Sequence, residues 1–259
     1  MGTSAMNKGN VRKLLDREAR GHLGGDWSTN LIEQFEILPA ATQGATVSNM
    51  WDLTGAGTPA VSFATDGGGI TITNTAGDAG ADNDAAAIFP LATGAWSVSR
   101  LPDGTRKHRL SGKIKTGASV ANYCIQWGFK LTDTAVYKTD ADQVFIVFDT
   151  DAIDIDPASG YADVSAGSTT FYVIFSKGGS DYAVNTGVRV TASTEYEFAI
   201  EIGTDSRANV FIDGNQVDLS ALPSMTTSAA LKPTARVLDR DSAGVTKALT
   251  LRQLHYYGK

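Results

Sequence analysis

Apolar and polar residues alternate along several stretches of the chain, a pattern typical of β-strands with one buried face. In the clearest stretch, residues 195–202, every second residue is apolar: Tyr196, Phe198, Ile200 and Ile202. We expect these side chains to face a core and the glutamates between them to face solvent. The same rule buries Val210 and Ile212 of the next strand. Residues 144–148 are apolar throughout, which indicates a central strand that is covered on both faces or whose outer face meets something else.

Short strands separated by turn residues make up most of the chain after Trp27. The predicted strands are residues 31–37, 70–74, 95–99, 110–116, 123–131, 144–149, 171–177, 187–190, 196–202, 208–212 and 248–256. Tight turns such as Gly178-Gly179-Ser180 and Asp213-Gly214 separate them, since Gly and Asp tolerate the backbone that such turns require. Residues 49–87 are glycine-rich and form the most loop-like region. This pattern predicts an all-β fold of the sandwich or barrel type.

One segment near the start has helical spacing instead. Val11, Leu14, Leu15 and Ala19 lie on one side of the predicted helix, and charged residues cover the other. Residues 8–20 include five basic and two acidic residues. We therefore predict an N-terminal arm with a short basic amphipathic helix in residues 1–25, followed by one β-domain in residues 26–259.

The arm has two interpretations. It could be an ordinary capping helix on one end of the β-domain, or it could dock into an apolar groove with a basic rim on a partner protein. In the second case the partner-binding residues would be Arg12, Lys13, Leu14, Leu15, Arg17 and Arg20. A helix with so few large apolar residues has little affinity for a membrane surface.

Composition and charge narrow the function classes. The chain has 22 Lys and Arg against 28 Asp and Glu, a net charge of −6, which argues against a protein that binds nucleic acid through its whole surface. The acids are 22 Asp and only 6 Glu, as suits a loop-rich β-protein. Cys124 is the single cysteine, so no internal disulfide can form. The sequence contains no zinc or nucleotide-binding motif, no apolar run long enough to span a membrane and no apolar core of a secretory signal.

Residues 171–219 resemble a known fold family. A strand and a glycine turn are followed by Gly187-Val188-Arg189-Val190-Thr191, by Thr194-Glu195-Tyr196-Glu197-Phe198-Ala199-Ile200, and by Val210-Phe211-Ile212-Asp213-Gly214. This order resembles the core of the concanavalin A-like lectin/glucanase (laminin-G-like) jelly roll. The resemblance implies an antiparallel β-sandwich, here with a short N-terminal α-helical arm. Lectins, glycosidases, adhesion modules and viral coat accessories all share this jelly roll.

The basic arm and the Ala/Gly/Thr/Asp-rich loops make the whole chain similar in style to virion proteins of tailed bacteriophages, in particular capsid decoration (cement) proteins. This resemblance implies a non-enzymatic protein, made in the host cytoplasm, that binds the outside of the head shell. Its partners would be the major capsid protein and its own copies, with a trimer as our guess, and neither nucleic acid nor membrane. The alternatives are a carbohydrate-binding lectin-like module or adhesin that binds surface glycans, and a laminarinase-like glycoside hydrolase.

Three glutamates carry the hydrolase alternative. Glu195, Glu197 and Glu201 follow one another on one predicted strand, and a retaining glycosidase needs two carboxyl groups about 5–5.5 Å apart. Laminarinase-like enzymes have Asp at the middle position, where this chain has Glu197, and tryptophans are absent from this strand. The competing interpretation is the solvated outer face of a sheet, which the strand alternation already predicts.

An acidic segment offers a calcium site as a second hypothesis. Residues 133–163 contain eight acids and one base, and calcium prefers clustered carboxylates. The candidate ligands are Asp149, Asp151, Asp154 and Asp156. The calcium-loop pattern is missing, and Ile153 and Ile155 interrupt the oxygen donors. We therefore expect no cofactor and a solvated acidic loop.

Sugar binding often uses exposed aromatic rings, and four tryptophans could supply them: Trp27, Trp51, Trp96 and Trp127. Trp127 lies within an apolar strand, so we expect it in the core. Alternation also buries one of Tyr256 and Tyr257.

Overall fold

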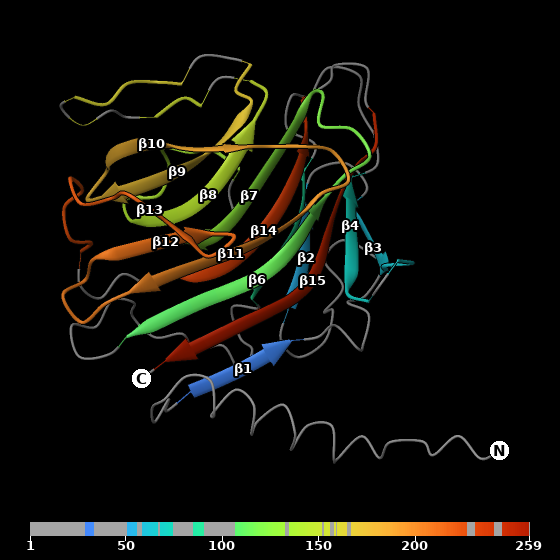
Figure 1. Ribbon diagram of the computed structural model, residues 1–259, viewed down its shortest axis with the longest axis horizontal. Helices are drawn as coiled ribbons and strands as arrows, with labels where there is room; N and C mark the ends of the chain where they lie inside the picture. Colours follow the sequence, from blue (N-terminus) through green and yellow to red (C-terminus); the bar gives the residue numbers. More distant parts are fainter. Residues whose placement is uncertain are drawn as a thin grey trace.

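A computed structural model of the chain shows two antiparallel β-sheets packed face to face (Figure 1). The structure describes residues 59–66, 68–74, 107–132, 135–151, 153–155, 158, 160–164, 167–226, 231–240 and 245–256 with their side chains. For residues 29–33, 51–55, 85–90 and 257–258 it describes the backbone alone. The predicted arm, residues 1–25, lies outside this part of the chain, as does the predicted strand 95–99.

Within the described residues, eight strands form the first sheet. In spatial order they are β13 (Asn215–Val217), β12 (Ala208–Ile212), β11 (Glu195–Ile202), β6 (His108–Thr116), β15 (Lys247–Gly258), β4 (Ile70–Asn74) and β3 (Ala60–Phe63), with β1 (Thr29–Glu33) beside the second half of β15. A register shift between Leu251 and Gln253 marks a β-bulge in β15 where it pairs with β6. Bulges bend a strand and re-aim its side chains.

The second sheet has seven described strands. Their order is β10 (Ser180–Arg189), β9 (Thr170–Lys177), β8 (Gln143–Asp149), β7 (Tyr123–Lys130), β14 (Lys232–Asp239), β5 (Ala85–Pro90) and β2 (Trp51–Gly55). Sequential strands lie side by side in one part of each sheet, β13-β12-β11 and β10-β9-β8-β7, and strands from distant parts of the chain are neighbours in the rest, as in β6-β15-β4 and β7-β14-β5. Such long connections between neighbouring strands are typical of a Greek-key or jelly-roll sandwich.

The main core lies between the sheets. Trp127 on β7 is 1% exposed, and its ring centroid lies 5.5 Å from that of Phe198 on β11. All six side chains expected to face inward are buried: Tyr196, Phe198, Ile200, Ile202, Val210 and Ile212. Tyr256 is buried as well. The predictions for these strands and for Trp127 are confirmed, and each large apolar side chain buried here contributes about 1.5–3 kcal/mol of hydrophobic free energy.

A second core covers the outer face of the seven-stranded sheet. Its sheet residues include Phe145, Val147 and Ile174, and two segments of the chain lie over them with Tyr137, Ile153 and Ile155. We call the described residues within 131–142 and 150–169, which precede and follow β8, the cover segments. Every residue of β8 is buried. The expectation of a central strand covered on both faces is confirmed, and its outer cover is the protein's own chain.

The structure corrects the sequence prediction in three places. Residues 49–87 contain β2, β3, β4 and the start of β5, so this region is not loop-like throughout. Residues 180–186 continue a strand, β10, because their backbone pairs with β9. Strand β14 lies in the middle of its sheet although Pro233 cannot donate a ladder hydrogen bond. Among the described residues, no helix is long and apolar enough to cross a membrane.

Candidate functional site

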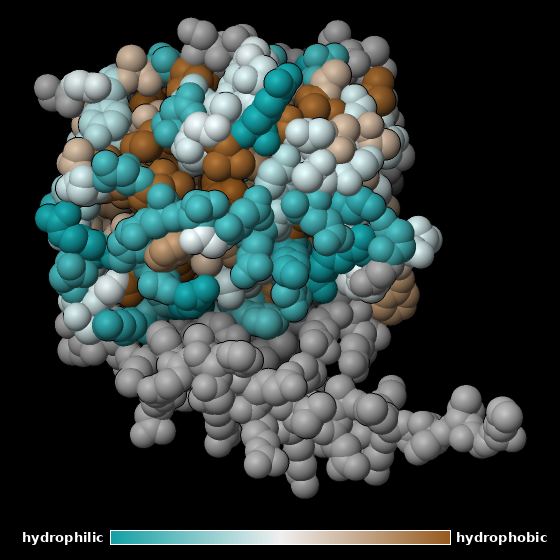
Figure 2. Space-filling model, viewed as in Figure 1, coloured by the Kyte–Doolittle hydropathy of each residue, from teal (hydrophilic) through white to brown (hydrophobic). Residues whose placement is uncertain are grey.

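The three candidate catalytic glutamates lie on the outer face of the eight-stranded sheet. Figure 2, from the same side as Figure 1, shows hydrophilic residues gathered over β11 and β6. The register of these strands places each glutamate opposite a basic residue: Glu195 opposite Lys115, Glu197 opposite Lys113, and Glu201 opposite Arg109. Opposite charges at facing positions stabilise an antiparallel pair by about 0.2–1 kcal/mol each. The glutamates therefore have a structural role as cross-strand charge pairs.

Two of these carboxylates also make direct ion pairs. Glu201 accepts a hydrogen bond from Arg109. Glu195 Oε1 accepts one from Arg252 Nε at 2.9 Å. Both carboxylates are partly exposed, and the described cleft of the protein lies elsewhere. The structure thus brings each glutamate to a cation and places none of them in a cleft that could enclose a substrate.

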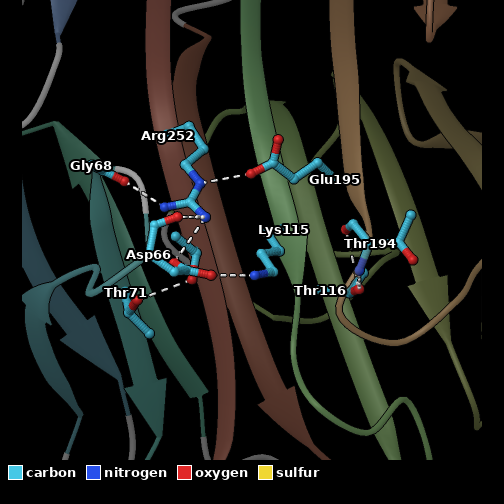
Figure 3. A network of polar contacts seen from close by, with 9 residues as sticks. Asp66, Gly68, Thr71, Lys115, Thr116, Thr194, Glu195 and Arg252 are labelled. Atoms are coloured by element: carbon cyan, nitrogen blue, oxygen red, sulfur yellow. Dashed lines mark hydrogen bonds and ion pairs between the residues drawn. The ribbon is translucent and has the colours of Figure 1, made fainter.

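Arg252 organises the outer face of this sheet (Figure 3). It lies at the bulge of β15, and its guanidinium group contacts both Glu195 and the turn between β3 and β4. It donates to Gly68 O at 2.7 Å, Asp66 O at 3.0 Å and Asp66 Oδ1 at 2.9 Å. Lys115 forms a further ion pair with Asp66. The hydrogen bonds from Lys115 and Arg252 lower the pKa of Asp66 below its usual value. This network fixes the β3–β4 turn onto the sheet and leaves little hydrogen-bonding capacity for a ligand.

The acidic segment is not the solvated loop that we expected, because Asp149, Ile153 and Ile155 are buried. In the part that the structure describes, its carboxylates do not gather into the calcium site considered as the alternative. Asp149 is buried and forms an ion pair with Arg240, with Nε–Oδ1 at 3.0 Å and Nη2–Oδ2 at 2.5 Å. Asp154 pairs with Lys138 at 2.6 Å. The backbone N–H of Asp151 donates to Asp149 Oδ1 at 3.0 Å. Asp156 lies outside the described residues. No group of three or more His, Cys, Asp or Glu side chains within the described ranges could hold a metal ion.

The buried end of this segment is a structural polar network. Asp149 also accepts a hydrogen bond from the hydroxyl of Tyr137, and Tyr137 Oη lies 3.4 Å from Cys124 Sγ. Burial raises the pKa of the Cys124 thiol and that of Tyr137. A thiol that is buried and protonated is a poor nucleophile. Cys124 therefore belongs to the packing beneath the cover segments and not to a reactive site.

Hydrogen bonds from the sheet hold down the first cover segment. Gln126 Nε2 donates to Ala135 O at 2.7 Å, and Lys130 Nζ donates to Val136 O at 3.1 Å. Gln143 donates to the next carbonyl, that of Tyr137. Three consecutive backbone carbonyls thus receive side-chain donors from β7 and β8. The outer face of the seven-stranded sheet is occupied here by the chain itself and offers no open binding surface at these residues.

A cleft opens at the edge of the sandwich, between the β12–β13 hairpin, residues 218–223 and β9. Its volume is about 460 Å³, within the range of small-molecule sites. The buried part of its lining is apolar and consists of Phe175, Val217, Leu219 and Leu222. The more exposed part consists of five polar residues, Arg207, Asn209, Gln216, Asp218 and Ser220, together with Ala208 and Pro223. The cleft therefore has an apolar floor and a polar rim.

Hydrogen bonds order the rim. Gln216 Nε2 donates to Asn209 Oδ1 at 3.0 Å, and Arg207 Nη1 donates to Leu222 O at 3.3 Å. Asp218 Oδ1 accepts from the Ser220 backbone N–H at 3.0 Å and from its hydroxyl at 2.7 Å. These bonds from Ser220 lower the pKa of Asp218, so its carboxylate is charged at neutral pH.

This cleft was not predicted from the sequence. The turn Asp213-Gly214 was predicted, but a sequence pattern does not show that residues beside it lie close to Phe175, which belongs to the other sheet. The six partner-binding residues predicted in the arm lie outside the described residues: Arg12, Lys13, Leu14, Leu15, Arg17 and Arg20. Trp27 and Trp96 also lie outside them, and only the backbone of Trp51 is described.

No protein-family model and no curated protein sequence matches the chain. Solved structures do match. A protein of unknown function from Shewanella oneidensis MR-1 is 12% identical with a TM-score of 0.58, covering 100% of this chain and 97% of that one. The alginate lyase AlgAT5 of polysaccharide lyase family 7 is 11% identical with a TM-score of 0.55, covering 87% and 98%. The carbohydrate recognition domain of Emp47p is 10% identical with a TM-score of 0.51, covering 90% and 99%.

At these identities the similarity shows the fold alone. The lyases and the recognition domains share the two-sheet sandwich described above. The chain therefore has the concanavalin A-like jelly-roll fold that residues 171–219 led us to expect.

Proposed function

We propose that this protein is a non-catalytic carbohydrate-binding module. The observation that carries the proposal is the cleft at the β12–β13 edge, which combines a buried apolar floor with five polar residues at its rim. Sugars present C–H faces and a set of hydroxyl groups, so an apolar surface next to hydrogen-bonding groups suits them. Structural neighbours named as alginate lyase and carbohydrate recognition domain act on or recognise carbohydrates with the same fold.

The arrangement of the acidic residues favours binding over catalysis. A glycosidase of the retaining type needs one carboxyl group as nucleophile and another as acid/base on either side of the scissile bond. Glu195 and Glu201 form ion pairs with arginines, and Glu197 lies opposite Lys113 in the sheet register. In the cleft, Asp218 is the single carboxylate of the described lining. Neither surface supplies a pair of carboxylates that face each other across a substrate.

The test is to measure binding and cleavage with the same protein. A glycan array and isothermal titration of the hits should identify the class of sugar that binds. A substitution at the cleft floor such as Leu222→Trp, with its folding checked by circular dichroism, should weaken this binding at least tenfold. Glu197→Gln, on the outer face of the eight-stranded sheet, is the matched control and should bind as the wild type does. Release of reducing ends or of unsaturated products from any polysaccharide, abolished by a substitution at Glu195 or Glu201, would refute the non-catalytic role.

A second proposal rests on the arm. Its excess of basic residues contrasts with the acidic remainder of the chain, and complementary charge promotes docking between proteins. This supports the role inferred from the sequence, decoration of a phage head by contact with the major capsid protein, with copies of the chain assembled as a trimer. Deletion of residues 1–25 should abolish co-sedimentation with empty capsids and leave the thermal unfolding of the β-domain unchanged. Undiminished co-sedimentation of this variant would exclude the arm from the contact.

A further inference from the structure

Strand β10 forms the edge of the seven-stranded sheet beside the cleft, and its inward-facing side chains are only half-buried. The register pairs Tyr182 with Phe175 and Val184 with Val173, and side chains at facing positions of an antiparallel pair lie on the same face of the sheet. Tyr182, Val184 and Val188 pack on the main core but remain partly exposed. Figure 2 shows hydrophobic residues at the surface between β10 and the hydrophilic residues over β11 and β6. The apolar floor of the cleft therefore continues onto the inner face of β10.

Two tyrosines extend this apolar surface through successive ring contacts. Phe175 in the cleft floor lies 5.8 Å from Tyr182 between ring centroids, and Tyr182 lies 4.9 Å from Tyr161, both with edge-to-face geometry. Tyr161 belongs to the second cover segment, where its N–H donates to Ala158 O at 3.0 Å. The Ala158 N–H in turn donates to Asp181 O of β10 at 2.9 Å, which fixes this segment against the start of the strand. We call Tyr161 and Tyr182 the tyrosine shelf.

The chemistry of the tyrosine shelf suits the surface of a sugar ring. Both tyrosines are half-buried, and neither hydroxyl has a hydrogen-bond partner among the described residues. A tyrosine presents an apolar ring and a polar tip, whereas a pyranose presents C–H groups on its faces and hydroxyl groups around its edge. Tyrosine can contact both parts of a sugar at a small cost in conformational entropy, because its side chain has few rotatable bonds.

The backbone of β10 argues against an added peptide strand as the occupant of this surface. At the start of the strand, the outward-facing carbonyl of Asp181 already accepts from the Ala158 N–H. A register shift between Asn185 and Arg189 interrupts the strand, and Asn185 Oδ1 accepts from the Gly187 N–H at 2.8 Å. Bulges and covered edges protect a strand from pairing with another chain. A ligand here would bind through side chains and not through a backbone ladder, as a sugar chain does.

From these observations we propose that the cleft and the tyrosine shelf form one extended site for a sugar chain longer than a disaccharide. This inference rests on the carbohydrate-binding function proposed above and adds the class of ligand, an oligosaccharide or polysaccharide chain. One end of the chain occupies the cleft, and the units that follow stack on Tyr182 and Tyr161. Each of the two ring-to-ring distances, 5.8 and 4.9 Å, is close to the length of one sugar unit along a chain.

The experiment is isothermal titration of the full chain with four series of oligosaccharides, each from dimer to hexamer: cello-, laminari-, chito- and galacturonate oligosaccharides. In at least one series the affinity should rise at least tenfold from dimer to pentamer, because contacts at a second subsite of the same ligand are intramolecular. Tyr161→Ala should weaken pentamer binding about fivefold and leave dimer binding unchanged, because the dimer is held by the cleft. Leu222→Trp, at the cleft floor, should weaken the binding of both.

Three further variants separate the shelf from a general effect of removing a tyrosine. Tyr161→Phe keeps the ring and should retain most of the gain in affinity with chain length. Tyr161→Leu keeps apolar packing on Tyr182 but lacks a flat ring, so it should lose the gain as Tyr161→Ala does, and it replaces that variant if alanine prevents folding. Tyr172→Ala is the matched control, because Tyr172 is half-buried on the other face of the same sheet, and it should bind every length as the wild type does. Circular dichroism and thermal melting establish that each variant is folded.

The outcomes are distinguishable. If a glycan binds but its affinity does not rise with chain length, or rises equally in the folded Tyr161 variants, the shelf is not part of the site and the inference fails, although the protein is still a carbohydrate-binding module. If the Tyr161 variants weaken dimer and pentamer equally, the site is not divided between cleft and shelf, and the inference also fails. If the wild type binds no glycan on the array or in titration, the proposed function itself fails.

Discussion

Two neighbouring glycines in the β3–β4 turn differ in the space around them. Alanine substitutions at the two positions therefore test how closely this turn packs against β15. Gly68 and Gly69 have almost the same positive φ, 86° and 87°. A Cβ atom added at Gly68 would meet nothing within 4 Å. A Cβ atom at Gly69 would lie 2.1 Å from Leu251 O and 2.7 Å from Arg252 Cα, at the bulge of β15. Alanine at either position therefore has the same backbone strain, but at Gly69 it also has a steric clash with backbone.

The expected magnitudes follow from these two terms. A left-handed backbone costs an L-residue about 1–2 kcal/mol, so Gly68→Ala should lower the free energy of unfolding by about that amount. Overpacking against backbone adds about 1–3 kcal/mol, so Gly69→Ala should lower it by about 2–5 kcal/mol. Lifting the turn also separates Asp66 from Arg252 and Lys115. For a domain of this size, each kcal/mol lost from the free energy of unfolding lowers Tm by about 2–4 °C.

The assay is equilibrium urea unfolding followed by tryptophan fluorescence, with thermal melts as a second measurement. The slope of the free energy against urea should be the same for the two variants and the wild type, so that the midpoints report stability alone. Gly69→Ala should be less stable than Gly68→Ala by at least 1 kcal/mol. Equal stability of the two variants would refute the close contact between the β3–β4 turn and the bulge of β15.

Three other predictions concern buried or half-buried groups. Arg240→Met leaves the carboxylate of Asp149 buried without its cation and should lower the free energy of unfolding, measured by urea titration, by about 3–5 kcal/mol. Adding Asp149→Asn should recover part of this loss, and an unchanged stability of Arg240→Met would contradict the buried ion pair. Cys124, 0% exposed with a raised pKa, should react with a thiol reagent only as fast as the protein unfolds, and rapid labelling in native buffer would contradict this. Burial lowers the pKa of His255 below 6.5, so the unfolded chain binds the proton more tightly than the folded chain, and the free energy of unfolding falls as the pH drops below about 6.5. His255→Gln should reduce this fall in a series of urea titrations at different pH, and an unchanged pH dependence would assign the fall to other groups.

Strands in which apolar and polar residues alternate were predicted from the sequence. Strands that are buried on both faces, or that contain a proline, were not all predicted. Residues 70–74 and 208–212 are strands with the predicted bounds, because one apolar face gives a clear period of two. Strand β14 was missed since all but its first residue are buried, which removes the alternation, and since Pro233 argues against a central strand. The short strand β13 has one buried residue, Val217, and no period at all.

The candidate sites depend on contacts between strands that are distant in the sequence, which a pattern within one strand does not show. Alternation correctly placed the glutamates of β11 outside the core, but their partners Lys113 and Arg109 lie more than eighty residues earlier in the chain, and the register that brings them together cannot be read from one strand. The cleft was not predicted for the same reason, because its floor includes Phe175 of β9 and its rim is formed by β12, β13 and the residues next to them. Ile153 and Ile155 were seen as interruptions of an acidic run, whereas they anchor a cover segment.

The cover segments limit where the sequence of this fold can be altered. Tyr137, Ile153 and Ile155 pack on one face of the seven-stranded sheet, so substitutions among them disturb the packing of the second core. The β12–β13 turn at Asp213-Gly214 is exposed, and nothing lies within 4 Å of a Cβ atom added at Gly214. Loops of other lengths can be grafted at this turn without repacking the interior, so the hairpin beside the cleft is the place where new recognition can be engineered into the scaffold.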